Sequence, residues 1–222
     1  MTGNVFRPGG LELTEKIAEH LGLCERSSVL DVGCGAGASL AFLCERYGCA
    51  AAGIDCAEKA VATARALLPH VQILQADAQS LPFPAGSFDA VLMECSLSLF
   101  ADPQKALEEA RRVLRQGGRL AIGTLCRERG PSLVCDGLIS LDRLLPLLEG
   151  LGFERILLED RSDALAQLAI DAIFEFGSLE AYFQRAREAI GGTVIGCDAI
   201  RNKKELRYCL IVAEKAADQT VR

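Results

Sequence analysis

A glycine-dense turn between two apolar segments constrains this chain more than any other feature of its sequence. Residues 29–32 are apolar apart from one acid, Asp31, and Gly33, Gly35 and Gly37 follow at alternate positions before an apolar helical segment. Glycine has no Cβ, so the backbone of such a turn can lie close to a ligand. The helix after the turn presents unpaired N–H groups and the positive end of its dipole. The pattern predicts a strand, a ligand-binding turn and a helix.

The spacing of these glycines separates two kinds of nucleotide site. Dinucleotide-binding turns carry Gly-x-Gly-x-x-Gly, whereas this turn reads Gly-x-Gly-x-Gly. With its acid-bearing strand, the segment resembles the first motif of the class I S-adenosylmethionine-dependent methyltransferases. That resemblance implies S-adenosylmethionine as the cofactor. A nicotinamide-dependent oxidoreductase on a related sheet is the alternative, and the position of the third glycine disfavours it.

Later segments resemble the same family in its order and spacing. They lie at residues 74–78, 81–83, 87–91 and 106–118, so the resemblance covers residues 28–125. Each motif is weak alone, but the series of five is specific.

Alternating strand and helix patterns predict an α/β fold. We expect a doubly wound, mostly parallel seven-stranded sheet, the Rossmann-like methyltransferase fold, with a helical insertion between the last two strands. Strands are predicted at 28–33, 50–55, 71–76, 88–94, 119–125, 153–159 and 206–214. Helices are predicted at 11–23, 36–47, 57–68, 102–115 and 141–151, with two more inside 162–190 that separate at Gly177 and Ser178.

Composition argues against several classes of function. Half of the 222 residues are hydrophobic and the net charge is −6. We therefore expect one domain over residues 1–222, and no binding to nucleic acid, which needs a basic surface. Residues 1–10 lack the layout of a signal peptide, and no apolar run reaches the roughly 18 residues of a membrane span. The chain is expected to be cytoplasmic and to bind no membrane.

Three acids fall at the carboxyl ends of predicted strands, where open α/β sheets bind their ligands. If the cofactor is S-adenosylmethionine, Asp31 lies near its positively charged methionine end. Asp55 accepts hydrogen bonds from the ribose hydroxyls, and Asp77 with the N–H of Ala78 reads the adenine edge. A helix cap or turn acid is the alternative for each acid alone. The predicted cofactor-binding residues are Asp31, Gly33, Cys34, Gly35, Gly37, Asp55, Cys56, Asp77, Ala78 and Glu94.

The end of the fourth predicted strand is expected to face the transferred methyl group. Family members that methylate nucleic-acid bases or glutamine often carry Asn/Asp-Pro-Pro-Tyr/Phe there, whereas this chain has Met93-Glu94-Cys95-Ser96, which counts against those acceptors. Glu94 is interpreted as a general base or as a residue that holds the methionine end of the cofactor. An exposed strand-end acid is the alternative.

Cys95 and Cys135 are the other candidate catalytic residues. Their positions resemble two cysteines of the arsenite methyltransferases, in which three thiolates suit a soft metalloid. The chain departs from that family before the glycine turn, where Cys24 is the only cysteine. A core position is the alternative for all three, because cysteine is among the most buried residue types. No resident metal is expected, because the chain has no Cys-x-x-Cys and only two histidines.

The sequence thus predicts transfer of a methyl group from S-adenosylmethionine to a small-molecule acceptor, with a thiol or arsenite as the sharpest candidate. A C- or O-methyltransferase of the quinone-biosynthesis type and a non-catalytic S-adenosylmethionine-binding protein are the alternatives. Residues 160–201 are longer and more apolar than a simple connection needs. We expect them to form a lid over the substrate, a homodimer contact, or both. Residues 4–10 are expected to fold over the cofactor.

Overall fold

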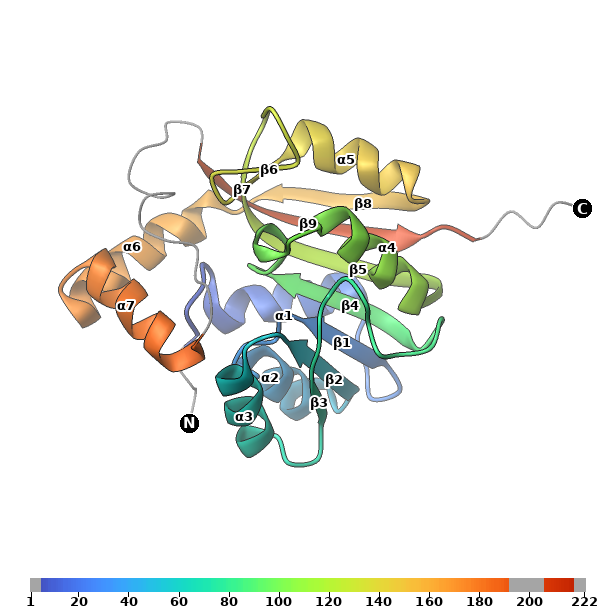
Figure 1. The fold of residues 1–222 in the computed structure, drawn as a ribbon, viewed down its shortest axis with the longest axis horizontal. Coiled ribbons are helices and arrows are strands. Elements are labelled where there is room, and N and C mark those ends of the chain that lie inside the picture. Colours follow the sequence, from blue (N-terminus) through green and yellow to red (C-terminus); the bar gives the residue numbers. More distant parts are fainter. Residues whose placement is uncertain (1–4, 192–205, 218–222) are drawn as a thin grey trace, which may run out of the picture.

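The computed structural model describes residues 5–191 and 206–217, which form a central sheet with helices on both faces (Figure 1). The strands are β1 (Ser28–Val32), β2 (Ala50–Asp55), β3 (Gln72–Gln75), β4 (Phe88–Glu94), β5 (Leu114–Arg127), β6 (Val134–Cys135), β7 (Leu138–Ser140), β8 (Phe153–Asp160) and β9 (Arg207–Lys215). The helices are α1 (Gly10–Leu21), α2 (Ala38–Tyr47), α3 (Glu58–Leu67), α4 (Pro103–Val113), α5 (Leu141–Gly150), α6 (Ser162–Phe176) and α7 (Leu179–Ile190), with a 3-10 turn at Leu97–Leu99.

The predicted doubly wound sheet is confirmed. Strands β3, β2, β1, β4 and β5 lie side by side in that order and are parallel. Strand β9 pairs antiparallel with β5, and β8 pairs antiparallel with β9. The order reverses between β1 and β4, which places the ligand-binding crevice of such folds at the carboxyl ends of these strands.

Two short strands add to the seven that were predicted. Strands β6 and β7 form a hairpin, and β7 continues the sheet beside the last residues of β5, Cys126 and Arg127. A two-residue strand such as β6 is too short for a periodicity of two to appear in the sequence.

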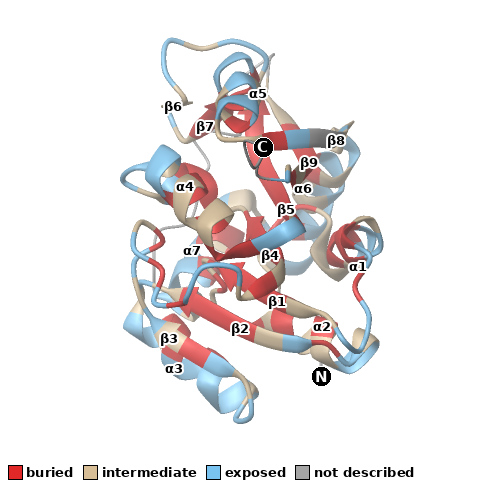
Figure 2. Cartoon of the chain, turned by 90° about the vertical axis from the view of Figure 1, so that its right-hand side faces the viewer, coloured by how far each residue is buried: buried red, intermediate tan, exposed pale blue. Residues whose placement is uncertain are grey.

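Alternate residues of the strands divide the core into layers. Leu30 and Val32 of β1 pack in the cluster with α4 and α5, whereas Val29 packs in the cluster with α1. A third cluster joins α2 and α3 around Leu40 and Val61. Figure 2 shows the buried strands between the helices. Burial on both faces explains why the inner strands read as continuous apolar runs.

The predicted boundary between the helix at 102–115 and the strand at 119–125 is wrong. The helix expected to reach Arg115 ends at Val113, and β5 begins at Leu114, which pairs with Phe88 of β4. The start of this helix follows its sequence signal, because the side chain of Asp102 accepts a hydrogen bond from the N–H of Lys105 (3.0 Å). Pairing with a distant strand overrides helix propensity at the other end.

The helical insertion forms α6 and α7, which stand beyond the carboxyl ends of the parallel strands (Figure 1). They separate where expected: Gly177 has a φ of 80°, and the Ser178 side chain accepts a hydrogen bond from the N–H of Ala181. Residues 192–201 of the predicted insertion lie outside the described residues. On the outer side of α6, Phe174 is 86% exposed. The expected dimer contact stays a prediction.

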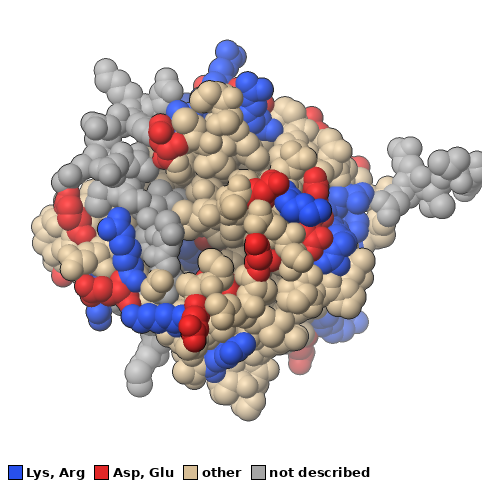
Figure 3. Space-filling model, viewed as in Figure 1, with Lys and Arg blue, Asp and Glu red and all other residues tan. Residues whose placement is uncertain are grey.

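No helix in residues 5–191 or 206–217 is long and apolar enough to cross a bilayer. On the face shown in Figure 3, acidic and basic side chains are interspersed rather than gathered by sign. The expectation that the protein binds no nucleic acid stays a prediction.

Gly53 of β2 provides a test of the packing behind the glycine turn. A Cβ at Gly53 would lie 2.6 Å from Cδ1 of Leu40 and 2.9 Å from Sγ of Cys34. We expect Gly53→Ala to lower the free energy of unfolding by about 1–3 kcal/mol, because overpacking strains neighbours that cannot move freely. Urea unfolding measures this. Gly150→Ala in α5 is the matched control, since a Cβ there meets no atom within 4 Å; an equal loss in both variants would contradict the packing argument.

Candidate functional site

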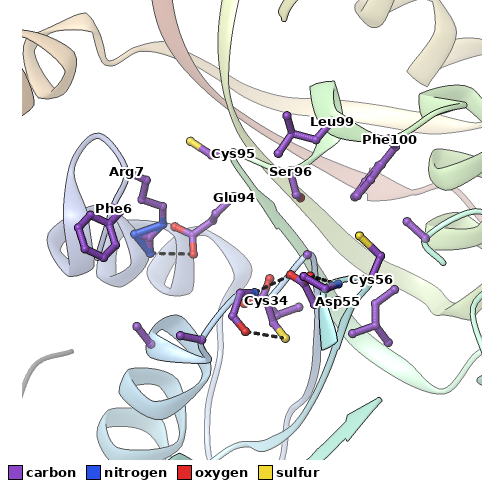
Figure 4. Close-up of a pocket in the computed structure, with 18 of the residues that line it drawn as sticks. Phe6, Arg7, Cys34, Asp55, Cys56, Glu94, Cys95, Ser96, Leu99 and Phe100 are labelled. Atoms are coloured by element: carbon purple, nitrogen blue, oxygen red, sulfur yellow. Dashed lines mark hydrogen bonds and ion pairs between the residues drawn. The ribbon is translucent and has the colours of Figure 1, made fainter. Parts of the chain in front are cut away.

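A large cavity opens at the carboxyl ends of β1, β2 and β4, where the fold reverses its strand order. Its volume is about 460 Å³, within the usual range of small-molecule sites. Its lining includes nine of the ten predicted cofactor-binding residues, all except Gly37, together with Cys95. Figure 4 shows Glu94 between Asp55 and Cys56 on one side and Cys95 on another.

The glycine turn takes conformations that favour glycine. Gly33, Gly35 and Gly37 have φ values of 85°, 53° and 85°. The N–H groups of Gly33 and Cys34 donate to the carbonyl of Ile54 (2.8 and 2.9 Å), which ties the turn to β2. A Cβ at Gly33 would lie 2.5 Å from Cβ of Ser96, whereas one at Gly35 meets no protein atom within 4 Å. Gly35 is thus the point at which the turn leaves room for a ligand.

Gly37 is the one predicted cofactor-binding residue that does not line the cavity. It is buried at the start of α2, where a Cβ would lie 3.1 Å from Cβ of Ala64 in α3. Its role in this structure is the close packing of α2 on α3.

Asp55 is already engaged by the turn. Its Oδ2 accepts the N–H of Gly35 and its Oδ1 accepts the N–H of Ala57, both at 2.9 Å. These bonds hold the carboxylate at the end of β2 beside the cavity. Cys56, next to it, is exposed and lines the same cavity.

Asp77 and Ala78 lie at the outer side of the cavity. The backbone N–H and the side-chain amide of Gln79 donate to the Asp77 carboxylate and lower its pKa. Asp77 is therefore a carboxylate at neutral pH, and the neighbouring Ala78 is buried.

A buried ion pair joins the segment before α1 to the end of β4. Nη2 of Arg7 lies 3.0 Å from Oε2 of Glu94, and both side chains are less than a tenth exposed. Oγ of Ser39 donates to Oε2 of Glu94 (2.8 Å) and Oγ1 of Thr14 donates to Oε1 (3.2 Å). Arg7 also donates to Ser39 and Thr14. The segment that precedes α1, helix α1 itself and the start of α2 thus meet at one carboxylate of β4.

Sequence reasoning missed Arg7, Thr14 and Ser39. Residues 4–10 were expected to cover the cofactor, and Arg7 does line the cavity, but its pairing with Glu94 had no local signal. The two residues are 87 positions apart. Glu94 is not the exposed strand-end acid that was the alternative, because it is 8% exposed.

Asp31 is a buried carboxylate beside this cluster. It is 2% exposed. Burial, followed by the nearby charge of Glu94, raises its pKa to about 8, although Arg7 acts in the opposite direction. A cation bound in the cavity would reverse this balance and favour the charged form.

Cys95 faces the cavity in a strained backbone conformation. Its φ is 56°, unusual for a residue with a side chain. Its Sγ lies 3.4 Å from the hydroxyl of Tyr208 on β9, which occupies the space left by the absent Cβ of Gly123. Burial raises the pKa of the Cys95 thiol to about 11. The group is a neutral thiol at physiological pH.

The other two candidate cysteines do not join Cys95. Cys135 lies in β6, where its carbonyl accepts a hydrogen bond from Arg127 (2.6 Å), and it does not line the cavity. Cys24 is exposed and precedes β1, at the opposite edge of the sheet from the cavity. Within the described residues, no group of three His, Cys, Asp or Glu side chains is placed to hold a metal ion.

The insertion closes one side of the cavity. Leu168 of α6 and Phe183 and Ala189 of α7 line it. The rings of Phe6 and Tyr182 pack edge to face with centroids 5.5 Å apart, and Nζ of Lys59 in α3 donates to the carbonyl of Glu188. The insertion therefore contacts both the segment before α1 and helix α3, and its role as a lid stays a prediction.

Comparison with known proteins finds relatives that match this chain over most of its length. A family model described as a methyltransferase domain matches residues 30–122. The 27-O-demethylrifamycin SV methyltransferase of Amycolatopsis mediterranei is 31% identical over 226 residues, which cover 91% of this chain and 82% of the relative. The O-methyltransferase cnsE of Penicillium expansum is 30% identical over 222 residues, 93% of this chain and 78% of the relative.

Other relatives match over less of their length. The methyltransferase GfsG of Streptomyces halstedii is 34% identical, over 52% of this chain and 44% of its own length, so the chain spans about half or less of several curated relatives. Among solved structures, the cyclase SpnF has a TM-score of 0.73 at 27% identity, covering 96% of this chain and 86% of that one.

The raised pKa of Asp31 predicts how stability depends on pH. Below about pH 4 the acid is protonated in both folded and unfolded states and carries no penalty. As pH rises toward 8, the Asp31 carboxyl ionises readily in the unfolded chain but only reluctantly in the folded one. The wild type therefore loses stability over this range. Asparagine does not ionise, so we expect Asp31→Asn to avoid this loss. At pH 8 its free energy of unfolding should exceed that of the wild type by roughly 1–3 kcal/mol, because each pKa unit is worth about 1.4 kcal/mol.

Urea unfolding at pH 5 and pH 8 measures this difference. The control is Asp89→Asn, because hydrogen bonds from Ser28 and Arg115 lower the pKa of Asp89 despite its burial. That variant should lose stability about equally at both pH values. An advantage of Asp31→Asn that does not grow from pH 5 to pH 8 would show that Asp31 does not titrate in this window.

Proposed function

The chain belongs to the S-adenosylmethionine-dependent methyltransferases, and we propose that it transfers a methyl group from S-adenosylmethionine to a small-molecule acceptor held under the α6–α7 insertion. One observation carries the proposal. The glycine turn and the acids that end β1 and β2 line one cavity with Asp77, which follows β3, and with Cys95 and the insertion on another side. A cofactor site and an acceptor site therefore share one space.

The charges of the cavity support this cofactor. S-adenosylmethionine carries a sulfonium, an ammonium and a carboxylate. At one end of the cavity Glu94 is paired with Arg7, and Asp31 adds a second carboxylate whose charged form a bound cation favours. These groups complement the charges of the cofactor. We propose that Asp31 contacts the cationic groups and that Arg7 and Glu94 hold the amino-acid end.

The other proposed contacts follow from position. Asp55, fixed by the N–H groups of Gly35 and Ala57, accepts hydrogen bonds from the ribose hydroxyls. Asp77 and the N–H groups of Cys56 and Ala78 contact the adenosine. The open space at Gly35 leaves room for the part of the cofactor that joins its ribose to its methionine end.

The cofactor supplies a methyl group on a positively charged sulfur, open to a nucleophile on the side opposite that sulfur. The protein contributes mainly position and exclusion of water. We propose that the acceptor lies against Cys95, Leu99 and Leu125, with Leu168 and Phe183 of the insertion above it. Glu94 is able to act as the proposed general base only if its ion pair with Arg7 breaks, because the paired carboxylate is not available to take a proton from the acceptor.

The nature of the acceptor follows from what Cys95 is able to do. A thiol with a pKa of about 11 is a weak proton acceptor at neutral pH. With Cys24 and Cys135 outside the cavity, three thiolates do not meet around one metalloid in the described residues. We therefore favour an oxygen or carbon nucleophile over arsenite or a thiol. Its own acidity, rather than a strong base in the protein, produces the reactive form.

Binding of S-adenosylhomocysteine tests the cofactor half of the proposal. We expect Asp55→Ala to weaken binding by about 10- to 100-fold, because a hydrogen bond to a charged group is worth about 1.5–3 kcal/mol. Titration calorimetry measures the dissociation constant. Glu58→Ala, an exposed neighbour in α3 that does not line the cavity, is the control. Equal affinity in wild type and Asp55→Ala would remove the proposed ribose contact.

Release of S-adenosylhomocysteine tests catalysis and the role of Cys95. We expect turnover with at least one small phenolic or enolic acceptor, and a less than about tenfold fall in kcat for Cys95→Ser, because the serine hydroxyl keeps the bond to Tyr208. A loss of about a hundredfold or more with cofactor binding intact would make the thiol itself part of the chemistry. Cofactor binding without turnover on any acceptor would favour the non-catalytic alternative.

A further inference from the structure

Charge is unevenly distributed over the cavity. Of the described residues that line the cavity, the basic one is Arg7 and the acidic ones are Asp31, Asp55, Asp77 and Glu94. The acids lie at the ends of the strands or directly after them, on the side that we assign to the cofactor. The remaining side has no charged residue of either sign among those described.

Arg7 is not free to neutralise an anionic acceptor. Its guanidinium pairs with Glu94 at 3.0 Å and donates to Ser39 (2.9 Å), Thr14 and the carbonyl of Gly10 (3.1 Å). Breaking this pair to bind another anion would leave Glu94 buried without its counter-ion, which is costly. An acceptor with a carboxylate or phosphate would therefore enter a cavity whose net charge is already negative.

The acceptor side is apolar and partly open. Phe6, Leu99, Phe100, Leu125, Leu168 and Phe183 form its lining. Leu99 is 38% exposed, a large apolar side chain that faces a cavity rather than the core. An apolar molecule would cover such surface and displace water from it. In Figure 4, Leu99 lies beyond Ser96, on the side away from Asp55, and Phe100 lies between Leu99 and Cys56.

Among the described residues that line this side, the polar side chains are those of Cys95 and Ser96, and the Ser96 hydroxyl donates to the carbonyl of Val32 (2.6 Å). The Cys95 thiol lies 3.4 Å from the Tyr208 hydroxyl and lines the cavity, whereas Tyr208 is fully buried. The left-handed backbone at Cys95 fixes where the thiol points. One weak, neutral hydrogen-bonding group in an apolar wall suits an acceptor with one polar atom at the reacting end.

We propose that the acceptor is an uncharged, largely apolar molecule with a single reactive hydroxyl, and that Leu99 and Leu168 help to exclude anionic acceptors. This rests on the proposed function, since it assigns that side of the cavity to the acceptor. Selection comes from an apolar wall on which the described residues place no free cation, and from acids that repel an anion.

Matched pairs of phenols test the proposal. Each pair is a methyl ester and its free carboxylate: para-hydroxybenzoate with its ester, and a hydroxynaphthoate with its ester. Calorimetry on the protein saturated with S-adenosylhomocysteine gives each dissociation constant. We expect the ester to bind at least about tenfold more tightly than the carboxylate in at least one pair, because like-charge juxtaposition is costly in a partly desolvated site.

Two variants and one control test whether the cavity wall causes the selection against anionic acceptors. We expect each of two single variants, Leu168→Lys and Leu99→Lys, to bind the carboxylates more tightly. In each, the preference for the ester over its carboxylate should fall to less than about threefold. Ile170→Lys adds the same charge to α6 at a residue that is 48% exposed and does not line the cavity. It should leave the preference unchanged.

The outcomes separate this inference from the proposed function. Carboxylates that bind as well as their esters, or S-adenosylhomocysteine bound while neither pair binds, would overturn the inference and leave the cofactor assignment standing. Failure to bind S-adenosylhomocysteine would overturn the proposed function itself. Equal effects of Leu168→Lys, Leu99→Lys and Ile170→Lys would show that overall charge, rather than the cavity wall, sets the preference.

Discussion

The rest of the site depends on the ion pair and hydrogen bonds that the buried carboxylate of Glu94 makes. A carboxylate at the end of an inner strand is costly to bury unless it is paired and fully hydrogen-bonded. Arg7, Ser39 and Thr14 meet that requirement together. In doing so they fix the segment before α1, the start of α2 and the end of β4 against one another. The cavity takes its shape at that junction.

The same junction divides the cavity chemically. On one side, the acids at the strand ends and the N–H groups of the glycine turn provide a polar wall with fixed charges. On the other, α6 and α7 bring leucine and phenylalanine side chains over Cys95. A reaction between a cationic cofactor and an apolar acceptor needs both environments within a few ångströms. The fold supplies them from separate parts of the chain, the sheet edge and the insertion.

Much of the fold was predictable because its signals are local. The glycine turn, the proline and acid that start α4, and the break at Gly177 each depend on backbone preferences of a few neighbouring residues. The strand ends carrying Asp31 and Asp55 were predictable for the same reason, since parallel strands place their carboxyl ends at one edge. The first residues of β5 and the hairpin β6–β7 were not, because distant strands decide whether those residues pair. The error at Leu114 shows this, since Phe88 is its partner.

The sequence by itself determined the class of fold, the family resemblance and the group of residues that end the strands, because these follow from periodicity and from turn chemistry. Only the tertiary structure decided which side chains meet. It brought Arg7 to Glu94 and Tyr208 to Cys95, and it left Cys135 and Cys24 outside the cavity. It also placed Gly37 in the contact between α2 and α3. Such contacts join residues that are far apart in the chain, and the conformational preferences of neighbouring residues do not specify them.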